Sequence, residues 1–369
     1  MTGLRGVAAM LVVTYHYYPP GSIADPALGR FIGKGYLWVD LFFVLSGFLM
    51  AMNYAHLFVG GWSLRGWFDF LLRRLARIYP LYFVLVTASL VYTLAAYGQL
   101  QLRNPAPAVT LDHPVSAIAA NMLLIQSWGI ASSINGTAWS LSAEWAAYLL
   151  FPMLLGLALF GRAGLALVAG MGVAAMIAVT VGLTMHDGGH HSGPLDAYDG
   201  TTLQPILRCL GGFLLGLLTY RAAQSARVLV WAGNDATTGL VIFLLAAGLA
   251  NGIHDLAIYP LFAALVLGLY GNRGMIGRLL GSRPIHRLGI NSYSIYLLHG
   301  YLIAPRHGLD EWLQTWIPTP SAHLATSFAS YGVLVLIACL AYRGIEEPGR
   351  RLLHRFGRAA LPAPSSARA

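Results

Sequence analysis

Long apolar runs separated by short polar segments fill the sequence from its second residue onward. An apolar run of about 18 residues is long enough to cross a bilayer as a helix. Ten stretches are candidate spans: 2–18, 36–58, 75–97, 142–160, 163–185, 203–220, 228–250, 256–271, 289–305 and 323–342. A further stretch, 115–128, is too short to cross comfortably, and we expect a re-entrant or interfacial helix there. The pattern predicts an all-α, polytopic integral membrane bundle of about ten transmembrane helices plus that short helix.

Composition and charge support this interpretation. The 369 residues are 57% hydrophobic and 10% charged, whereas about a quarter of the residues in a soluble domain are charged. The net charge is +9, but the basic residues lie between apolar runs, which indicates membrane orientation rather than nucleic-acid binding. If the N-terminus is in the cytoplasm and the chain crosses ten times, the segments on the outer side of the membrane contain only four basic residues: Arg30, Lys34, Arg103 and Arg306. We therefore expect an integral membrane protein with both termini in the cytoplasm.

The chain is expected to form one transmembrane domain, 1–345, followed by a basic cytoplasmic tail, 346–369, that is partly disordered. Cys209 and Cys339 lie in apolar runs without a paired or metal-ligand spacing, so we expect no disulfide and no metal site. The histidine-rich segment 186–191 could bind a metal, but it lacks a second set of ligands, and incidental surface histidines are the preferred interpretation. The first apolar run lacks a cleavage site and is predicted to be retained.

Two ionisable residues at the outer ends of apolar runs are candidates for catalysis, because charge inside a membrane is costly. His16 could act as a general base on a sugar hydroxyl, or it could be an interfacial histidine in an aromatic belt. Asp40 opens the next run at the same depth. It could orient His16, as in hydrolase triads, or simply favour a helix N-terminus. Ser46 and Gly47 follow, and a small pair favours close helix packing over a nucleophile.

A basic cluster in RRLARIYP is the candidate donor site. Arg73 and Arg77 share one helical face at a spacing of four residues, with Arg74 beside them. Planar guanidinium groups suit the phosphates of coenzyme A, although positive-inside anchoring explains the cluster equally well. After the last run, Glu346 and Glu347 are expected to form a solvated charge pair at a helix end.

Two further segments carry polar residues at membrane depth, TAWSLSAEWAAYLLFP and NSYSIYLLHG. Glu144 is a candidate second carboxylate for catalysis, although Ser140 or Ser142 capping a helix would explain the same pattern. Tyr296 and His299 stand near the middle of a late span and either bridge helices or line the acyl path. The candidate substrate contacts are Ser46, Trp139, Ser142, Tyr296 and His299.

Six segments in this order resemble the acyltransferase-3 family of membrane acyltransferases: GLRGVAAMLVVTYH, GYLWVDLFFVLSGFLM, RRLARIYPLY, TAWSLSAEWAAYLLFP, NSYSIYLLH and IEEPGRR. Bacterial members O-acetylate O-antigen, exopolysaccharide and other glycans. The resemblance implies a ten-helix core in the bacterial inner membrane with both termini inside, and an essential catalytic histidine at His16. It further implies that Arg5 is needed, that Asp40 supports the site and that Glu144 is the carboxylate of the WSLS-x-E segment. Arg73, Arg74 and Arg77 would act at the acyl-CoA.

Two features depart from that family pattern. Only four residues precede Arg5, so we expect either a misplaced start or a missing N-terminal arm. No hydrolase-like domain follows the last span, so any second transfer step would need a separate periplasmic partner.

The functional hypothesis is therefore a membrane-bound acyltransferase. It would move an acyl group, acetyl from acetyl-CoA, onto a hydroxyl of a carbohydrate or glycolipid acceptor. Direct attack on the thioester and a covalent acyl-enzyme both fit the residues. The alternative is a polytopic transporter or flippase for a glycolipid or small solute, which would often show duplicated halves; the sequence has no such duplication.

Overall fold

The regular elements of the chain are helices throughout its described part. The computed structural model describes residues 1–18, 21–58, 60–103, 114–160, 163–186, 193–198 and 200–360, and within these ranges it contains no strand. The predicted all-α class is confirmed. Residues 187–191 of the histidine-rich segment and the last nine residues of the predicted tail, 361–369, lie outside the described residues.

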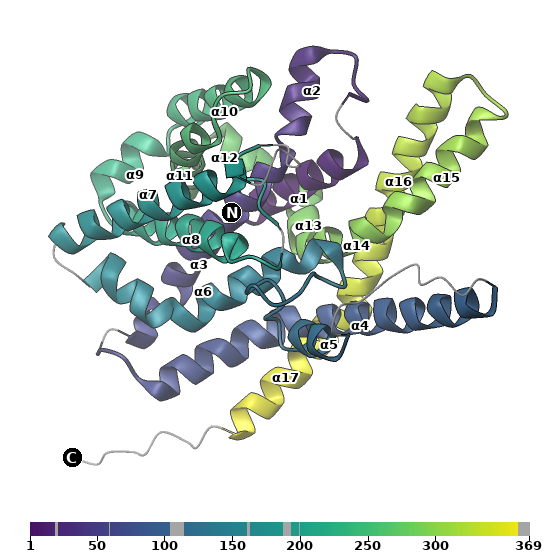
Figure 1. Cartoon of the computed structure of the whole chain (residues 1–369). Coiled ribbons are helices and arrows are strands. Elements are labelled where there is room, and N and C mark those ends of the chain that lie inside the picture. The colour runs from purple at the N-terminus through teal and green to yellow at the C-terminus, as the bar shows by residue number, and fades with distance from the viewer. Residues whose placement is uncertain are drawn as a thin grey trace.

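The helices follow one another along the chain (Figure 1). They are α1 Thr2–Tyr17, α2 Pro26–Gly33, α3 Trp38–Tyr54, α4 Leu64–Arg103, α5 Pro114–Met122, α6 Trp139–Leu155, α7 Ala163–His186, α8 Gln204–Ala223, α9 Ala226–Ala232, α10 Asp235–Ala250, α11 Asp255–Gly271, α12 Met275–Leu280, α13 Arg283–Ile290, α14 Ser292–Leu298, α15 Ile303–Gln314, α16 Thr319–Ala341 and α17 Glu347–Ala360.

Several helices are suited to a membrane. Within the described ranges, five helical segments are long and apolar enough to cross: Pro26–Phe58, Leu64–Tyr92, Gly136–Leu159, Gln204–Ala223 and Thr319–Leu353. The pair α9 and α10, bent by 65°, makes a sixth if it is taken as one span. The chain is thus a multi-pass membrane protein. Each of the ten predicted stretches contains a helix, but the count of ten crossings is not confirmed.

Two predicted stretches are shaped by breaks in the helix. The stretch 289–305 is divided, because α14 ends at Leu298, a 3₁₀ turn covers His299–Leu302, and α15 begins at Ile303. The short stretch 115–128 holds α5, whose nine residues are too few to cross a membrane. The chain leaves α5 through Leu124, a buried residue with φ of 60°.

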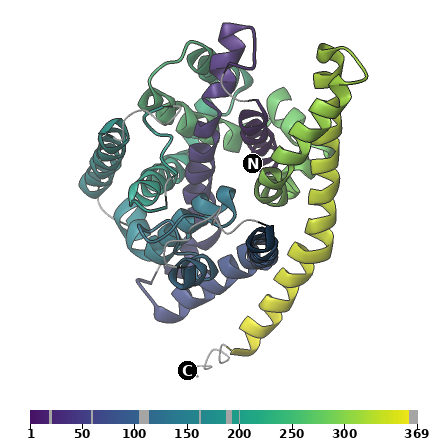
Figure 2. The same cartoon turned by 45° about the vertical axis from the view of Figure 1, so that its right-hand side comes forward.

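Helix α3 occupies the middle of the bundle, between α1 and α8, while α16 continues through Tyr342–Glu346 into α17 as one long rod along the side (Figure 2). Glycines bring α3 and α8 into backbone contact. A Cβ on Gly47 would lie 1.9 Å from the Phe213 carbonyl oxygen, and one on Gly216 would lie 2.1 Å from that of Val44. The predicted packing role of Gly47 is therefore confirmed.

The close approach of α3 and α8 can be tested with two glycine variants. We expect Gly47→Ala to destabilise the protein by about 1–3 kcal/mol, because backbone atoms of Phe213 cannot move aside as a side chain would. Thermal unfolding in detergent measures the change. The matched control is Gly172→Ala in α7, where nothing lies within 4 Å of the added Cβ. Equal stability of the two variants would contradict the close packing.

Candidate active site

A fully buried ion pair fixes α3 to α8. The Arg208 guanidinium donates from Nε to Asp40 Oδ1 at 2.9 Å and from Nη2 to Oδ2 at 2.6 Å, and both side chains are 0% exposed. Tyr259 of α11 donates to the same carboxylate. The predicted pairing of Asp40 with His16 is therefore wrong, because Arg208 and Tyr259 occupy the carboxylate oxygens. Asp40 supports the architecture around the site rather than the imidazole.

His16 instead has a second histidine as its partner. Its Nδ1 lies 2.9 Å from the Val12 carbonyl oxygen, so Nδ1 carries the proton. His299 similarly donates from Nδ1 to the Tyr296 carbonyl oxygen at 2.7 Å, which leaves its Nε2 as an acceptor 3.3 Å from His16 Nδ1. This arrangement assigns the Nδ1–H tautomer to His16 and leaves its Nε2 lone pair without a partner among the described residues. An imidazole in that state can accept a proton.

The His16 side chain lies on the wall of a cavity of about 670 Å³, here called the His16 cavity. Aromatic and polar side chains share that wall: Tyr15, Tyr36, Asn135, Thr137, Trp139, Asp196, Tyr198, Tyr296 and Tyr301. Tyr15 donates to Asp196, in the segment 193–198 before α8, at 3.4 Å. Arg208 fixes the same segment by donating to the Ala197 carbonyl oxygen at 3.2 Å. Asp196 thus places a carboxylate in the cavity where Asp40 was expected. The sequence did not indicate this position of Asp196, because a single acidic residue in a loop has no pattern that marks it as part of a site.

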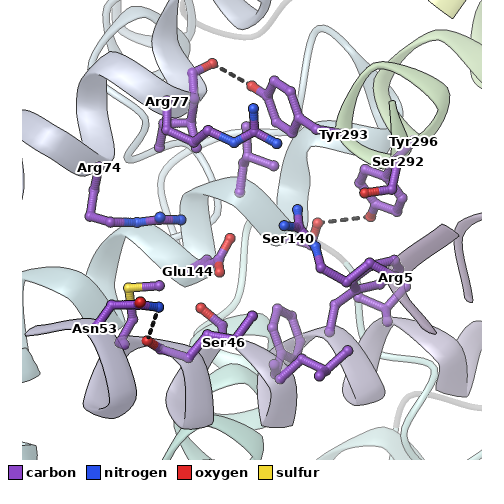
Figure 3. Close-up of a pocket in the computed structure, with 18 of the residues that line it drawn as sticks. Arg5, Ser46, Asn53, Arg74, Arg77, Ser140, Glu144, Ser292, Tyr293 and Tyr296 are labelled. Atoms are coloured by element: carbon purple, nitrogen blue, oxygen red, sulfur yellow. Dashed lines mark hydrogen bonds between the residues drawn. The ribbon is translucent and has the colours of Figure 1, made fainter. Parts of the chain in front are cut away.

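A second, smaller cavity of about 210 Å³ lies among α1, α3, α4, α6 and α14, here called the central cavity (Figure 3). Arg5 and Arg74 point into it from opposite sides, and Arg77 lies above Glu144. Ser46 lies on the wall below and Tyr296 lines the cavity as well, so six predicted site residues meet here. The Arg5 guanidinium has no hydrogen-bond partner among the described residues. It therefore offers an unoccupied cationic donor group to whatever enters the cavity.

Tyr148, which the sequence reasoning missed, links these groups. Its hydroxyl donates to Glu144 Oε1 at 2.5 Å and accepts from Arg74 Nη2 at 2.7 Å. Ser46 Oγ lies 3.3 Å from the same hydroxyl. A buried tyrosine in an apolar helix looks like ordinary core, so nothing in the pattern singled it out.

Arg77 is held by Glu346, a carboxylate at the end of the last span. The two form an ion pair, and Ser294 of α14 donates to the other Glu346 oxygen at 2.8 Å. Glu346 is 0% exposed, so the prediction of a solvated charge pair is wrong for this residue. Removing a carboxylate from water requires such partners, and the pair ties the start of α17 to α4.

A third cavity of about 650 Å³, the arginine cavity, opens beside α4 and α17. Its lining includes six arginines and one acidic residue: Arg73, Arg74, Arg77, Arg350, Arg351, Arg355 and Asp69. Arg73 donates to Asp69 at 2.9 Å. The predicted cluster Arg73, Arg74 and Arg77 thus lies together on one surface, where its charge is suited to a phosphorylated ligand.

The three cavities lie in series because neighbouring ones share walls. Tyr54, Arg74 and Arg77 line both the arginine cavity and the central cavity. Val39 and Tyr296 line both the central cavity and the His16 cavity. An elongated molecule bound by its anionic end in the first cavity would therefore point toward His16.

The remaining predicted substrate contacts divide into two groups. Trp139 lines the His16 cavity, with the Arg208 guanidinium 5.3 Å from the centroid of its ring, and Tyr296 bonds Ser140 at 2.7 Å between the two inner cavities. Ser142 is fully buried and accepts a hydrogen bond from the Ser127 amide at 3.1 Å, outside the three cavities. The prediction that Ser142 touches substrate is therefore corrected. Its hydroxyl joins the loop after α5 to α6.

Comparison with known proteins identifies the family. Residues 1–343 match the family described as "Acyltransferase domain", Acyl_transf_3. The chain belongs to this family. It is therefore an acyltransferase, as the six segments predicted, and the transporter alternative is set aside.

Named relatives agree with this assignment. The chain is 28% identical to acyltransferase MdmB of Streptomyces mycarofaciens over 96% of its own length and 92% of the relative. It is 26% identical to the putative peptidoglycan O-acetyltransferase YrhL of Bacillus subtilis and 25% identical to the peptidoglycan O-acetyltransferase OatA of Listeria monocytogenes, in each case over 95% of this chain. The match spans about half of those two relatives, 54% and 55%. No solved structure matches.

The structural role of Asp40 can be tested by removing it. We expect Asp40→Ala to destabilise the protein by about 3–5 kcal/mol, because it leaves the Arg208 charge buried without a partner. The double variant Asp40→Leu, Arg208→Met should recover part of that loss. Thermal unfolding in detergent measures both, with Asp310→Ala, at a partly exposed pair with His323, as the control that changes little. Unchanged stability of Asp40→Ala would overturn this role.

Proposed function

We propose that the protein transfers an acetyl group from acetyl-CoA to a hydroxyl of a carbohydrate or glycolipid acceptor. Acetyl-CoA would enter from the cytoplasm of a bacterial cell, with the arginine cavity facing inward and both termini on that side. The excess of arginine at that end supports this orientation. The named O-acetyltransferase relatives support acetyl as the group and a glycan as the acceptor.

The observation that carries the proposal is the series of cavities between the arginine cluster and His16. Phosphates of the donor would bind Arg73, Arg74 and Arg77, since guanidinium groups form paired hydrogen bonds with phosphate oxygens. The uncharged pantetheine arm would continue through the central cavity. The thioester would then lie near Val39 and Tyr296, where the central cavity meets the His16 cavity.

The acceptor would occupy the His16 cavity. Tyr15, Tyr198 and Trp139 offer aromatic faces, and Asn135 and Thr137 offer hydrogen bonds. Such a mixture of apolar surface and a few polar groups is typical of small-molecule sites. The relatives named for peptidoglycan acetylation make an amino-sugar glycan a reasonable class of acceptor.

The chemical step follows from the tautomer of His16. Nε2 accepts the proton of the acceptor hydroxyl as its oxygen attacks the thioester carbonyl carbon. The tetrahedral intermediate collapses, the carbon–sulfur bond breaks, and the coenzyme A thiolate takes the proton back from the imidazolium. His299 accepts from Nδ1–H of His16 and so keeps Nε2 unprotonated at the start. The Tyr296 hydroxyl, which lines both inner cavities, is the donor we assign to the developing oxyanion, and Arg5 would contact the donor molecule in the central cavity.

Replacing His16 tests the proposed base. We expect His16→Ala to lower acetyl transfer by at least about a hundredfold, because general-base catalysis contributes that much or more. Mass spectrometry of surface glycans in expressing cells and release of coenzyme A thiol by the purified protein measure transfer. His323→Ala, at an exposed histidine, is the control expected to retain activity. Near-normal acetylation by a folded His16→Ala protein would remove His16 from the mechanism.

A double-mutant cycle tests the role of His299 as a positioning residue. We expect His299→Phe to lower kcat about tenfold while the KM for acetyl-CoA stays unchanged, since the donor binds elsewhere. In a His16→Ala background the same substitution should have no further effect on the residual rate. If the effects of the two substitutions on the rate are additive in the double variant, or if the fall in kcat of His299→Phe is accompanied by a loss of folding stability, the role of His299 is merely structural.

A further inference from the structure

Helix α17, which follows the residues that match the family, forms one wall of the arginine cavity. The family match ends at residue 343, and α17 begins at Glu347. Arg350, Arg351 and Arg355 of α17 line the cavity opposite Arg73, Arg74 and Arg77 of α4. The sequence alone indicated only a basic tail in this region.

The position of α17 is fixed by packing. A Cβ on Gly349 would lie 2.5 Å from Cβ of Pro80, so the helix lies directly against α4. The buried pair of Glu346 with Arg77 anchors the residue just before the helix. The arginines of α17 are therefore held at the cavity rather than on a loose tail.

The cavity carries more positive charge than its own carboxylates neutralise. Arg350 and Arg351 share Glu347, Arg77 pairs with Glu346, and Arg73 pairs with Asp69. Six guanidinium groups thus face three carboxylates. Arg355 has no partner among the described residues, and the Nε of Arg74 is buried without a hydrogen bond. Both observations indicate that an anion completes this site.

We propose that α17 supplies the subsite for the 3′-phosphate of coenzyme A, with Arg351 and Arg355 as its ligands. This inference rests on the proposed function, in which Arg73, Arg74 and Arg77 bind the diphosphate. The ligand then has phosphates at two places, and the cavity has arginines on two walls. Of the two walls that carry arginines, the α4 wall continues into the central cavity, through Arg74 and Arg77, whereas the arginines of α17 line the arginine cavity alone among the three cavities. The diphosphate, which is attached to the pantetheine arm, therefore belongs to α4, and the distal 3′-phosphate belongs to α17.

Binding of coenzyme A and dephospho-coenzyme A to the full-length protein in nanodiscs tests the proposal. The wild type should bind coenzyme A about tenfold more tightly, since a charge-assisted contact contributes on that scale. The variant Arg351→Gln, Arg355→Gln should bind both ligands with nearly the same Kd, equal to that of the wild type for dephospho-coenzyme A. Both side chains are exposed, and thermal unfolding verifies that the variant folds.

The matched control removes the same charge elsewhere. Arg283→Gln, Arg287→Gln, at exposed positions of α13 outside the cavity, should keep the tenfold preference. Equal wild-type affinity for both ligands, or a preference that survives in the α17 variant, would overturn the α17 subsite. If the wild type binds neither ligand, the donor in the proposed function is wrong as well.

A lipid headgroup carries the same phosphate chemistry, so the nanodiscs are made with and without phosphatidylglycerol. We expect the preference for coenzyme A and its loss in the variant in both lipid compositions. If the variant keeps the preference for coenzyme A and differs from the wild type only in a weaker dependence of ligand binding on phosphatidylglycerol, α17 is a lipid anchor and the proposal is overturned.

Discussion

The Asp40–Arg208 ion pair lies at the centre of the bundle, where α3, α8 and α11 meet and where neither side chain reaches solvent. In that environment a carboxylate or a guanidinium alone would be very unfavourable, so the pair is stable only with its hydrogen bonds complete. Arg208 also donates hydrogen bonds to the carbonyl oxygens of Tyr36 and Ala197. The Asp40–Arg208 pair therefore fixes both the start of α3 and the loop that contains Asp196. Helix α3 lines both the central cavity and the His16 cavity, and the loop that contains Asp196 lines the His16 cavity.

The sequence predicted the helices well and their interruptions poorly. Apolar length locates a membrane helix, and α1, α3, α8 and α16 lie close to their expected ranges. Length says nothing about where a helix breaks when the freed backbone groups find partners inside the protein. The turn at His299 is such a case, since the Tyr296 carbonyl oxygen accepts a hydrogen bond from the His299 ring. The same apolar run could have continued as one straight span.

Residue identity and position in the apolar runs selected several side chains that line the cavities, but they did not give the pairing of those side chains. His16 and Asp40 were expected at similar depth, and depth does not give the direction in which each helix turns its side chains. Asp40 faces α8 and pairs with Arg208, whereas His16 faces the 3₁₀ turn after α14 and contacts His299. Tyr148 and Asp196 were missed, and the burial of Glu346 was not expected. The contacts with Arg74, Tyr15 and Arg77 that place these residues in the site join positions far apart in the sequence. Only the folded chain brings those partners within reach.

The geometry of α1 explains how one small bundle keeps two incompatible chemistries apart. Arg5 and His16 are eleven residues apart on this helix, which is about 16 Å along its axis. The cationic groups needed for a phosphorylated donor therefore remain at one end, and the imidazole that must stay neutral to accept a proton remains at the other. Six arginines close to His16 would disfavour the imidazolium formed during transfer. Separation along α1 avoids that repulsion and leaves the neutral arm of the donor to bridge the distance.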